Sequence, residues 1–173
     1  TGGALAAIEY APAVRAEQAL LRKRGISLLV DIRSIPFSRH NPQYNQQPLS
    51  AALEDVGIHY YHLIALGGRR QPNPHSRNTG WRDPGFRAYA DYMQTPEFAE
   101  GLEWVIASSH HYRLAMMCAE AQALQCHRQL VADALVARQF IVRHIMAEGN
   151  DQLHRLTDFA RVDEDRVIYP ASQ

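Results

Sequence analysis

The stretch Ile26-Ser27-Leu28-Leu29-Val30-Asp31-Ile32 decides the fold class of this chain. Its centre, Leu28-Leu29-Val30, is a continuous apolar run and not an alternation of apolar and polar residues. Such runs are typical of strands that helices cover on both faces, which is the pattern of a parallel sheet. We therefore predict a buried strand over residues 26–32.

Helix and strand signals alternate on both sides of this strand. Thr95-Pro96-Glu97 is a strong helix start, with a cap, a proline at the first position and an acid. The expected strands are 4–9, 26–32, 58–63, 113–117 and 140–145, and the expected helices are 13–24, 48–56, 86–93 after an Asp83 cap, 96–108, 125–137 and a short one near 151–159. This order predicts an α/β fold with a mostly parallel sheet of about five strands flanked by helices.

The composition is that of one globular domain. The chain has 173 residues, of which 46% are apolar and 21% charged. No apolar run approaches the roughly 18 residues of a membrane span, and the first residues lack the basic region of a secretory signal. We expect a single domain over 1–173, with 147–173 as a less clear C-terminal extension, and no membrane association.

Two cysteines, Cys118 and Cys126, are too few for a disulfide scaffold. This usage favours a reducing compartment, and we expect the protein to be cytoplasmic.

The charge of the chain is neutral overall but uneven along the sequence. Eighteen basic residues balance 18 acidic ones, which argues against coating nucleic acid by general attraction. Lys23 is the only lysine, and the other basic residues are arginines. This preference reflects either composition bias or the use of arginine for forked recognition of carboxylates and phosphates. The stretch 69–87 holds five arginines and one acid, Asp83. This loop predicts a local anion site.

Polar and reactive residues gather where each expected strand ends. Ligands of open parallel sheets bind outside the carboxyl ends of the strands. The residues at these ends are Asp31, Arg33, Arg39 and Asn41 after the second strand, Gly67, Gly68 and Arg69 after the third, Cys118 and Glu120 after the fourth, and His144 in the fifth. Asp31 and Arg33 either form an ion pair or bind substrate, and the two glycines either make a turn or let backbone N–H groups cradle a phosphate.

Cys126-His127-Arg128 stands at the start of the helix expected over 125–137. A thiolate at a helix start has a lowered pKa. Three chemistries fit. Cys126 or Cys118 attacks an electrophile, with His127 or His144 as base, Glu120 as orienter and Arg128 holding an anion. The two cysteines form a reversible disulfide. Zinc binds both cysteines with histidines, although the spacing is not that of a CxxC site. The structural alternative is a half-buried cysteine at a helix cap.

Aromatic residues near the arginine-rich loop have two interpretations. Tyr89, Tyr92 and Met93 fall at helical spacing, which packing explains at least as well as base stacking. Trp81, in the loop itself, is typical of a residue that covers a site or a partner surface.

Several motifs resemble those of DUF488, a domain family of unknown function. They are Val30-Asp31-Ile32-Arg33-Ser34-Ile35-Pro36 with Asn41-Pro42-Gln43-Tyr44-Asn45, Leu66-Gly67-Gly68-Arg69, Phe86-Arg87-Ala88-Tyr89-Ala90-Asp91-Tyr92-Met93, and Cys118-Ala119-Glu120 with Cys126-His127-Arg128 and Val142-Arg143-His144-Ile145. The match runs in order over about 4–146. One departure is Glu9, where the family's first strand usually ends in a glycine. The resemblance implies the fold and the site positions without naming a reaction.

Two classes of function lead from these residues. The first is a small cytosolic enzyme with a Cys-His-Arg site acting on an anionic or nucleotide-like substrate. The second is a nucleic-acid-binding or regulatory module without catalysis, which uses the loop 69–87. A third is a zinc-stabilised structural protein. The candidate catalytic residues are Cys126, Cys118, His127 and Glu120, and the candidate binding residues are Asp31, Arg33, Arg39, Asn41, Gly67, Gly68, Arg69, Arg128, His144 and Tyr92.

Overall fold

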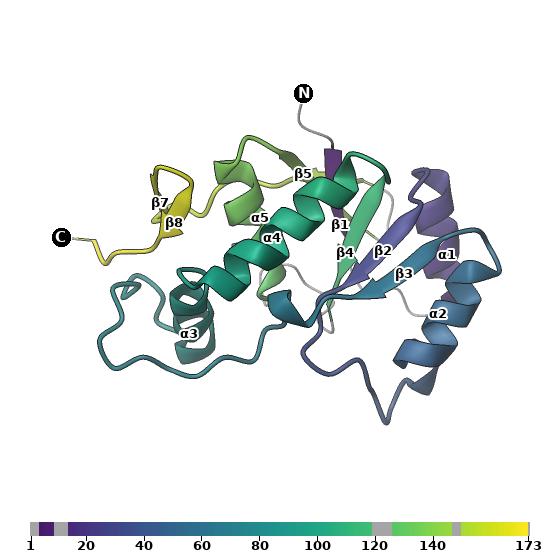
Figure 1. Ribbon diagram of the computed structural model, residues 1–173, viewed down its shortest axis with the longest axis horizontal. Helices are drawn as coiled ribbons and strands as arrows, with labels where there is room; N and C mark the ends of the chain where they lie inside the picture. Colours follow the sequence, from purple (N-terminus) through teal and green to yellow (C-terminus); the bar gives the residue numbers. More distant parts are fainter. Residues whose placement is uncertain (1–3, 9–13, 119–125, 147–149, 173) are drawn as a thin grey trace.

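A computed structural model describes the backbone of residues 4–8 and the whole of residues 14–118, 126–146 and 150–172. Within these ranges a sheet has the strand order β3-β2-β4-β1-β5-β6, in which the first five named strands are parallel and β6 is antiparallel (Figure 1). The strands are β1 Ala4–Ile8, β2 Leu28–Asp31, β3 His59–His62, β4 Leu114–Met117, β5 Ile141–Ile145 and β6 Gln152–Leu153; β7 Arg161–Asp163 and β8 Arg166–Ile168 form a separate hairpin. The predicted α/β class is confirmed.

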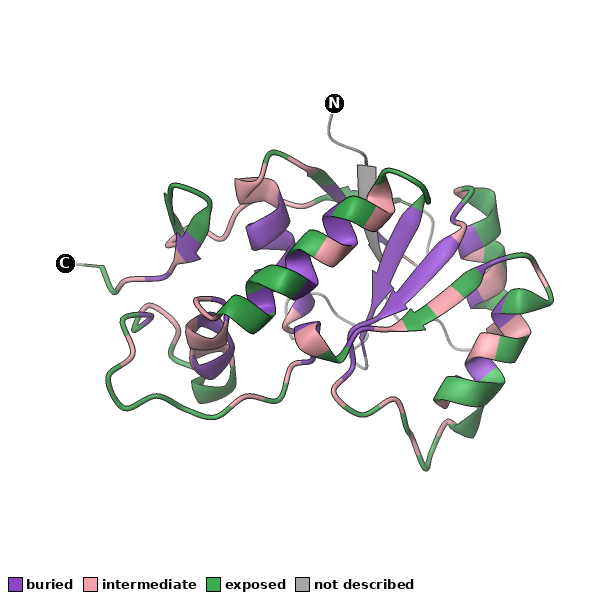
Figure 2. Cartoon of the chain, in the orientation of Figure 1, coloured by how far each residue is buried: buried purple, intermediate pink, exposed green. Residues whose placement is uncertain are grey.

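Helices cover both faces of this sheet. One face packs against α1 Val14–Lys23 and α2 Gln46–Glu54, and the other packs against α3 Pro84–Tyr92, α4 Pro96–Ser109 and α5 Arg128–Ala137. All residues of β2 and β4 are therefore buried, as Figure 2 shows. Double covering is what the apolar run of β2 predicts. No helix in the described part of the chain is long and apolar enough to cross a membrane.

The helix caps match the sequence signals. The Asp83 carboxylate accepts a hydrogen bond from the backbone N–H of Phe86 at 2.9 Å, and the Thr95 hydroxyl accepts one from Phe98 at 3.3 Å. Each cap satisfies one of the free N–H groups at a helix start. Both predicted caps are confirmed, and α3 and α4 begin at the prolines that follow them.

One element prediction is corrected at its boundary and another is wrong. The helix predicted over 125–137 is present, but it begins at Arg128, with His127 at its N-cap. The short helix predicted near 151–159 is replaced by β6 and extended chain. There the backbone N–H of His154 donates to the Val142 carbonyl at 2.8 Å, so pairing with β5 takes the place of helical bonds.

The strand order locates the crevice of the sheet. From β1 the chain runs through α1 to β2, which lies on one side of β1 in the sheet. From β4 it runs through α5 to β5, which lies on the other side of β1. Neighbouring strands whose connections leave in opposite directions open a crevice at their carboxyl ends. Here those strands are β1 and β4, and Cys118 directly follows β4.

Candidate active site

A pocket of about 590 Å³ opens at the carboxyl end of β4 and β2. Its wall is formed by the chain after β2, the glycine-containing turn after β3, the start of α3, and both cysteines. The lining residues are Arg33, Ser34, Ile35, Phe37, Gly68, Arg69, Asp83, Gly85, Phe86, Cys118, Cys126 and His127. A volume of this size suits a small-molecule ligand.

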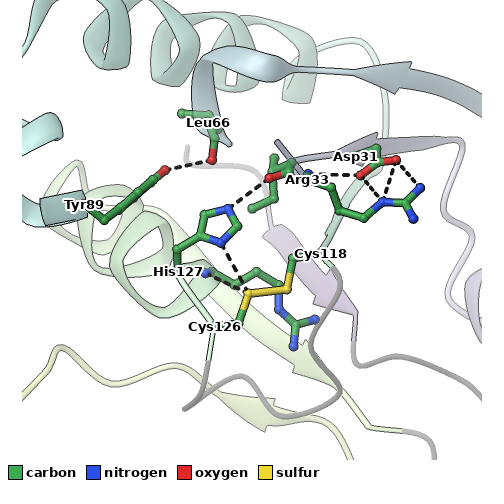
Figure 3. Close-up of a disulfide and its surroundings, with 9 residues drawn as sticks. Asp31, Arg33, Leu66, Tyr89, Cys118, Cys126 and His127 are labelled. Carbon is green, nitrogen blue, oxygen red and sulfur yellow. Dashed lines mark hydrogen bonds and ion pairs between the residues drawn. A yellow bond between two sulfur atoms is a disulfide. The ribbon is translucent and has the colours of Figure 1, made fainter. Parts of the chain in front are cut away.

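The sulfur atoms of Cys118 and Cys126 are joined in a disulfide in the pocket wall (Figure 3). Cys118 follows β4, and Cys126 lies just before the N-cap of α5. Each cysteine is 3% exposed. The sequence left nucleophilic, disulfide and metal chemistry open for this pair, and the structure places the two side chains within bonding distance.

A hydrogen bond with the Ile32 carbonyl helps to orient His127, and the other ring nitrogen points at Cys126 (Figure 3). Its Nε2 lies 2.9 Å from the Ile32 carbonyl, which can only accept, so Nε2 carries the hydrogen. Nδ1 is then the unprotonated nitrogen, and it lies 3.5 Å from the Cys126 sulfur. Burial lowers the pKa of His127 to about 4, against the opposing effect of the Ile32 bond. The imidazole is therefore neutral near pH 7, with no hydrogen on Nδ1.

Gly68 makes room for this histidine, and Gly67 makes room for Ser34. A methyl group on Gly68 would lie 2.6 Å from Nδ1 of His127, and one on Gly67 would lie 2.7 Å from the Ser34 hydroxyl. The backbone N–H of Gly67 donates to Ile64, and that of Arg69 donates to Ser34 at 2.9 Å. Two of the N–H groups expected to cradle a phosphate are thus engaged within the protein, so the close approach of side chains explains these glycines better.

Asp31 and Arg33 form a buried ion pair. The Arg33 guanidinium donates to the Asp31 carboxylate at 2.7 Å and to the Tyr44 carbonyl at 2.7 Å, and the Tyr60 hydroxyl also donates to Asp31. The ion-pair interpretation of these two residues is confirmed. Arg33 also lines the pocket, but its charge is already compensated.

Arg128 and His144 lie outside the pocket wall. Arg128 is fully buried in the first turn of α5. Nε2 of His144 lies 2.8 Å from Nδ1 of His154, whose Nε2 lies 2.7 Å from Asp133. Burial, reinforced by His154, lowers the pKa of His144 to about 4. His144 thus belongs to a second polar network. Arg128 is buried and is not among the residues that line the pocket, and its expected contact with an anionic substrate stays a prediction.

Three further predicted binding residues are not among those that line the pocket, and a binding role for them stays a prediction. The backbone N–H of Asn41 donates to the Ser38 hydroxyl at 3.1 Å, and Arg39 is exposed. The Tyr92 hydroxyl donates to the Ala65 carbonyl, while the Arg70 guanidinium stacks 3.5 Å above its ring. Glu120 lies outside the described residues.

Trp81 packs inward. Its ring contacts Phe86, Phe159 and Tyr169 at centroid distances of 5.0, 4.9 and 5.4 Å. This residue therefore anchors the arginine-rich loop to the C-terminal segment and offers no ring for base stacking.

Several site residues escaped the sequence reasoning. Ser34, Ile35, Phe37 and Phe86 line the pocket, and Ile35 and Phe37 are 54% and 60% exposed. The sequence signals for this rim were the large apolar residues in a proline-containing loop and the place of Ser34, Ile35 and Phe86 in the family-like motifs. Among the described residues no group of three histidine, cysteine, aspartate or glutamate side chains could hold a metal ion.

One domain family matches the chain. DUF488, a domain of unknown function, matches residues 13–135. This range contains the whole pocket wall. Neither the curated proteins nor the solved structures include a match.

Proposed function

The chain belongs to the DUF488 family, and we propose that it is a thiol-dependent enzyme that acts on an anionic or nucleotide-like small molecule. The observation that carries this proposal is the 3.5 Å contact between Nδ1 of His127 and the sulfur of Cys126 in the pocket wall. A base beside a cysteine sulfur is how thiol enzymes generate their nucleophile.

The reacting form is the dithiol. The Cys126 thiol then donates its hydrogen to Nδ1 of His127, which receives the proton as the sulfur attacks the substrate. The imidazolium returns this proton to the leaving group. The backbone N–H of Arg128, 3.5 Å from the same sulfur, stabilises the negative charge on the thiolate.

The pocket rim supports an anionic substrate with a flat apolar part. Arg69 is exposed on the wall and forms no ion pair within the described residues, whereas Arg33 is paired with Asp31. Arginine recognises carboxylates and phosphates through its forked donors. Phe37 and Phe86 supply apolar surface for a ring system on the same wall.

Alkylation of the reduced protein tests the proposal. The rates for Cys126 and Cys118 are measured separately by mass spectrometry across pH, with iodoacetamide. We expect Cys126 to show an apparent pKa below the roughly 8.5 of a free thiol. The variant His127→Gln should slow its alkylation near pH 7 by roughly 10-fold. Cys118 in the same digest is the control. An ordinary pKa for Cys126, unchanged in His127→Gln, would refute the proposal.

A second candidate is nucleic-acid binding by the loop 69–87, because Arg69, Arg77 and Arg82 are exposed there. The observations support it less, since Arg70 and Arg87 donate to backbone carbonyls and Trp81 packs inward. Titration with oligonucleotides at low salt distinguishes the two candidates. Binding that weakens steeply with salt and is lost in Arg77→Gln/Arg82→Gln favours this candidate.

A further inference from the structure

We propose that the reaction passes through the Cys118–Cys126 disulfide, so that the protein reduces a small disulfide substrate that bears carboxylate groups. This inference rests on the proposed function of Cys126 as a nucleophile. It adds a role for Cys118, the class of the substrate and the direction of electron flow.

The position of the bridge is the first argument. Both cysteines line the pocket, so the bridge is part of the wall that faces a bound ligand. The bridge also spans only a short separation of 8 residues. A bridge that closes a short loop restricts the unfolded chain less than one that joins distant segments. A disulfide that opens and closes during a reaction is expected to lie in a ligand pocket and to constrain the chain little.

The contacts of the Cys126 sulfur assign it the role of the attacking thiolate. The Cys126 sulfur contacts Nδ1 of His127 and accepts from the backbone N–H of Arg128, each at 3.5 Å. These groups stabilise the thiolate form of Cys126. The thiolate is the form that attacks a disulfide and the form that is released from one. Cys118, at the end of β4, is then the cysteine that resolves the mixed disulfide.

The balanced reaction has two exchange steps. The Cys126 thiolate attacks one sulfur of R–S–S–R′, and R′–S⁻ leaves and takes the proton held by His127. The Cys118 thiol loses its proton and attacks the Cys126 sulfur, and R–S⁻ leaves and takes up that proton. Two protein thiols become one disulfide, while the substrate gains two electrons and two protons. An external dithiol reduces the bridge and completes the cycle.

The wall of the pocket selects the class of disulfide. Arg69 favours carboxylate groups, and the exposed side chains of Ile35 and Phe37 at the rim favour an apolar or aromatic body. The aromatic dicarboxylate disulfide 5,5′-dithiobis(2-nitrobenzoate) has both features and releases a yellow thiol, so it serves as the probe.

The first measurement is stoichiometry on the reduced protein. We expect two equivalents of yellow thiol per wild-type chain, and a product whose intact mass shows an internal disulfide and no adduct. Cys118→Ser should release one equivalent and keep the adduct on Cys126. Cys126→Ser should react roughly 10-fold more slowly or worse. If the wild type stops at one equivalent with the adduct retained, the disulfide cycle is refuted, whereas fast alkylation of Cys126 would still uphold the proposed thiol function.

The second measurement tests the substrate class. Steady-state reduction of the probe, with dithiothreitol as reductant, is compared with that of the neutral hydroxyethyl disulfide. We expect Arg69→Gln to lower kcat/KM for the dicarboxylate by roughly 10-fold and to leave the neutral disulfide unchanged. Arg82→Gln, which removes an exposed arginine of the same loop outside the pocket wall, is the matched control. Equal losses in both arginine variants, or on both disulfides, would refute selection by Arg69.

Discussion

Glu17 lies in the first turn of α1 with 1% of its surface exposed. Burial raises the pKa of its carboxyl group to about 7, while the Tyr44 hydroxyl and the charges of Arg33 and Arg128 lower it by less and Asp31 raises it further. Nothing in the sequence marks this acid, which is one helical residue among several. The structure places it within electrostatic reach of the ion pair after β2.

Replacing Glu17 with glutamine should stabilise the protein at alkaline pH. The folded pKa exceeds the unfolded value, so the proton bound to Glu17 stabilises the fold below about pH 4.5, and this contribution is lost as the pH rises to about 7. Glutamine stays neutral throughout. The quantity compared is the free energy of unfolding of Glu17→Gln minus that of the wild type. We expect this difference to be about 2–3 kcal/mol larger at pH 8 than at pH 4.5. Urea unfolding at both pH values measures this difference.

A control for this prediction is Glu54→Gln, which removes an exposed acid at the end of α2. Its effect should not depend on pH to a comparable extent. A Glu17→Gln protein with the same relative stability at both pH values would show that the buried carboxyl is not protonated in the fold.

At the scale of elements, the turn after β3 and the start of α5 meet at the site. Gly68 belongs to that turn, and its missing side chain leaves the space that the His127 ring occupies. The close approach of two segments far apart in the sequence, and not a special backbone angle, therefore requires glycine here. The reactivity of Cys126 depends on this packing, because His127 is held between the turn and the Ile32 carbonyl.

Gly68→Ala should uncouple His127 from Cys126. The added methyl group would lie 2.6 Å from Nδ1, so the ring must move away from the sulfur. We expect alkylation of Cys126 near pH 7 to slow by roughly 10-fold, as in His127→Gln, while Cys118 in the same digest is unaffected. The far-UV circular dichroism spectrum should stay that of the wild type. Unchanged Cys126 kinetics in a folded Gly68→Ala protein would argue against His127 as the base.

At the scale of the whole molecule, the C-terminal segment is part of the packed structure although the family match ends at residue 135. Asp133, buried in α5, accepts hydrogen bonds from the rings and hydroxyls of this segment, namely His154, Thr157 and Tyr169. Asn78 of the arginine-rich loop accepts from the backbone N–H of Tyr169 at 2.9 Å. One carboxylate therefore ties the C-terminal segment to the helix that carries the site.

Tyr169→Phe should reduce the stability of the protein. The variant keeps the buried ring but loses the 2.7 Å hydrogen bond from the hydroxyl to Asp133. Hydrogen bonds to charged groups contribute about 1.5–3 kcal/mol, and we expect a loss in that range in urea unfolding. Tyr112→Phe, at a tyrosine that is 40% exposed, is the matched control and should change stability by less than about 0.5 kcal/mol. Equal effects of the two variants would show that the Asp133 network does not hold the segment.

The sequence alone determined the features that consecutive residues encode. The apolar run of β2 predicts a strand covered on both faces, and Asp83 and Thr95 predict helix starts, because periodicity and caps act over a few residues. The rule that ligands bind at the carboxyl ends of parallel strands also selected Cys118, Gly68 and Arg69, all of which line the pocket.

The tertiary structure alone decided which of these residues meet. The direction of Nδ1 of His127 depends on the Ile32 carbonyl, which follows β2. Gly68 is needed because the His127 ring lies against it. Arg128 is buried and does not line the pocket. These are contacts between segments far apart along the chain, and the order of the strands, which no local pattern records, brings them together.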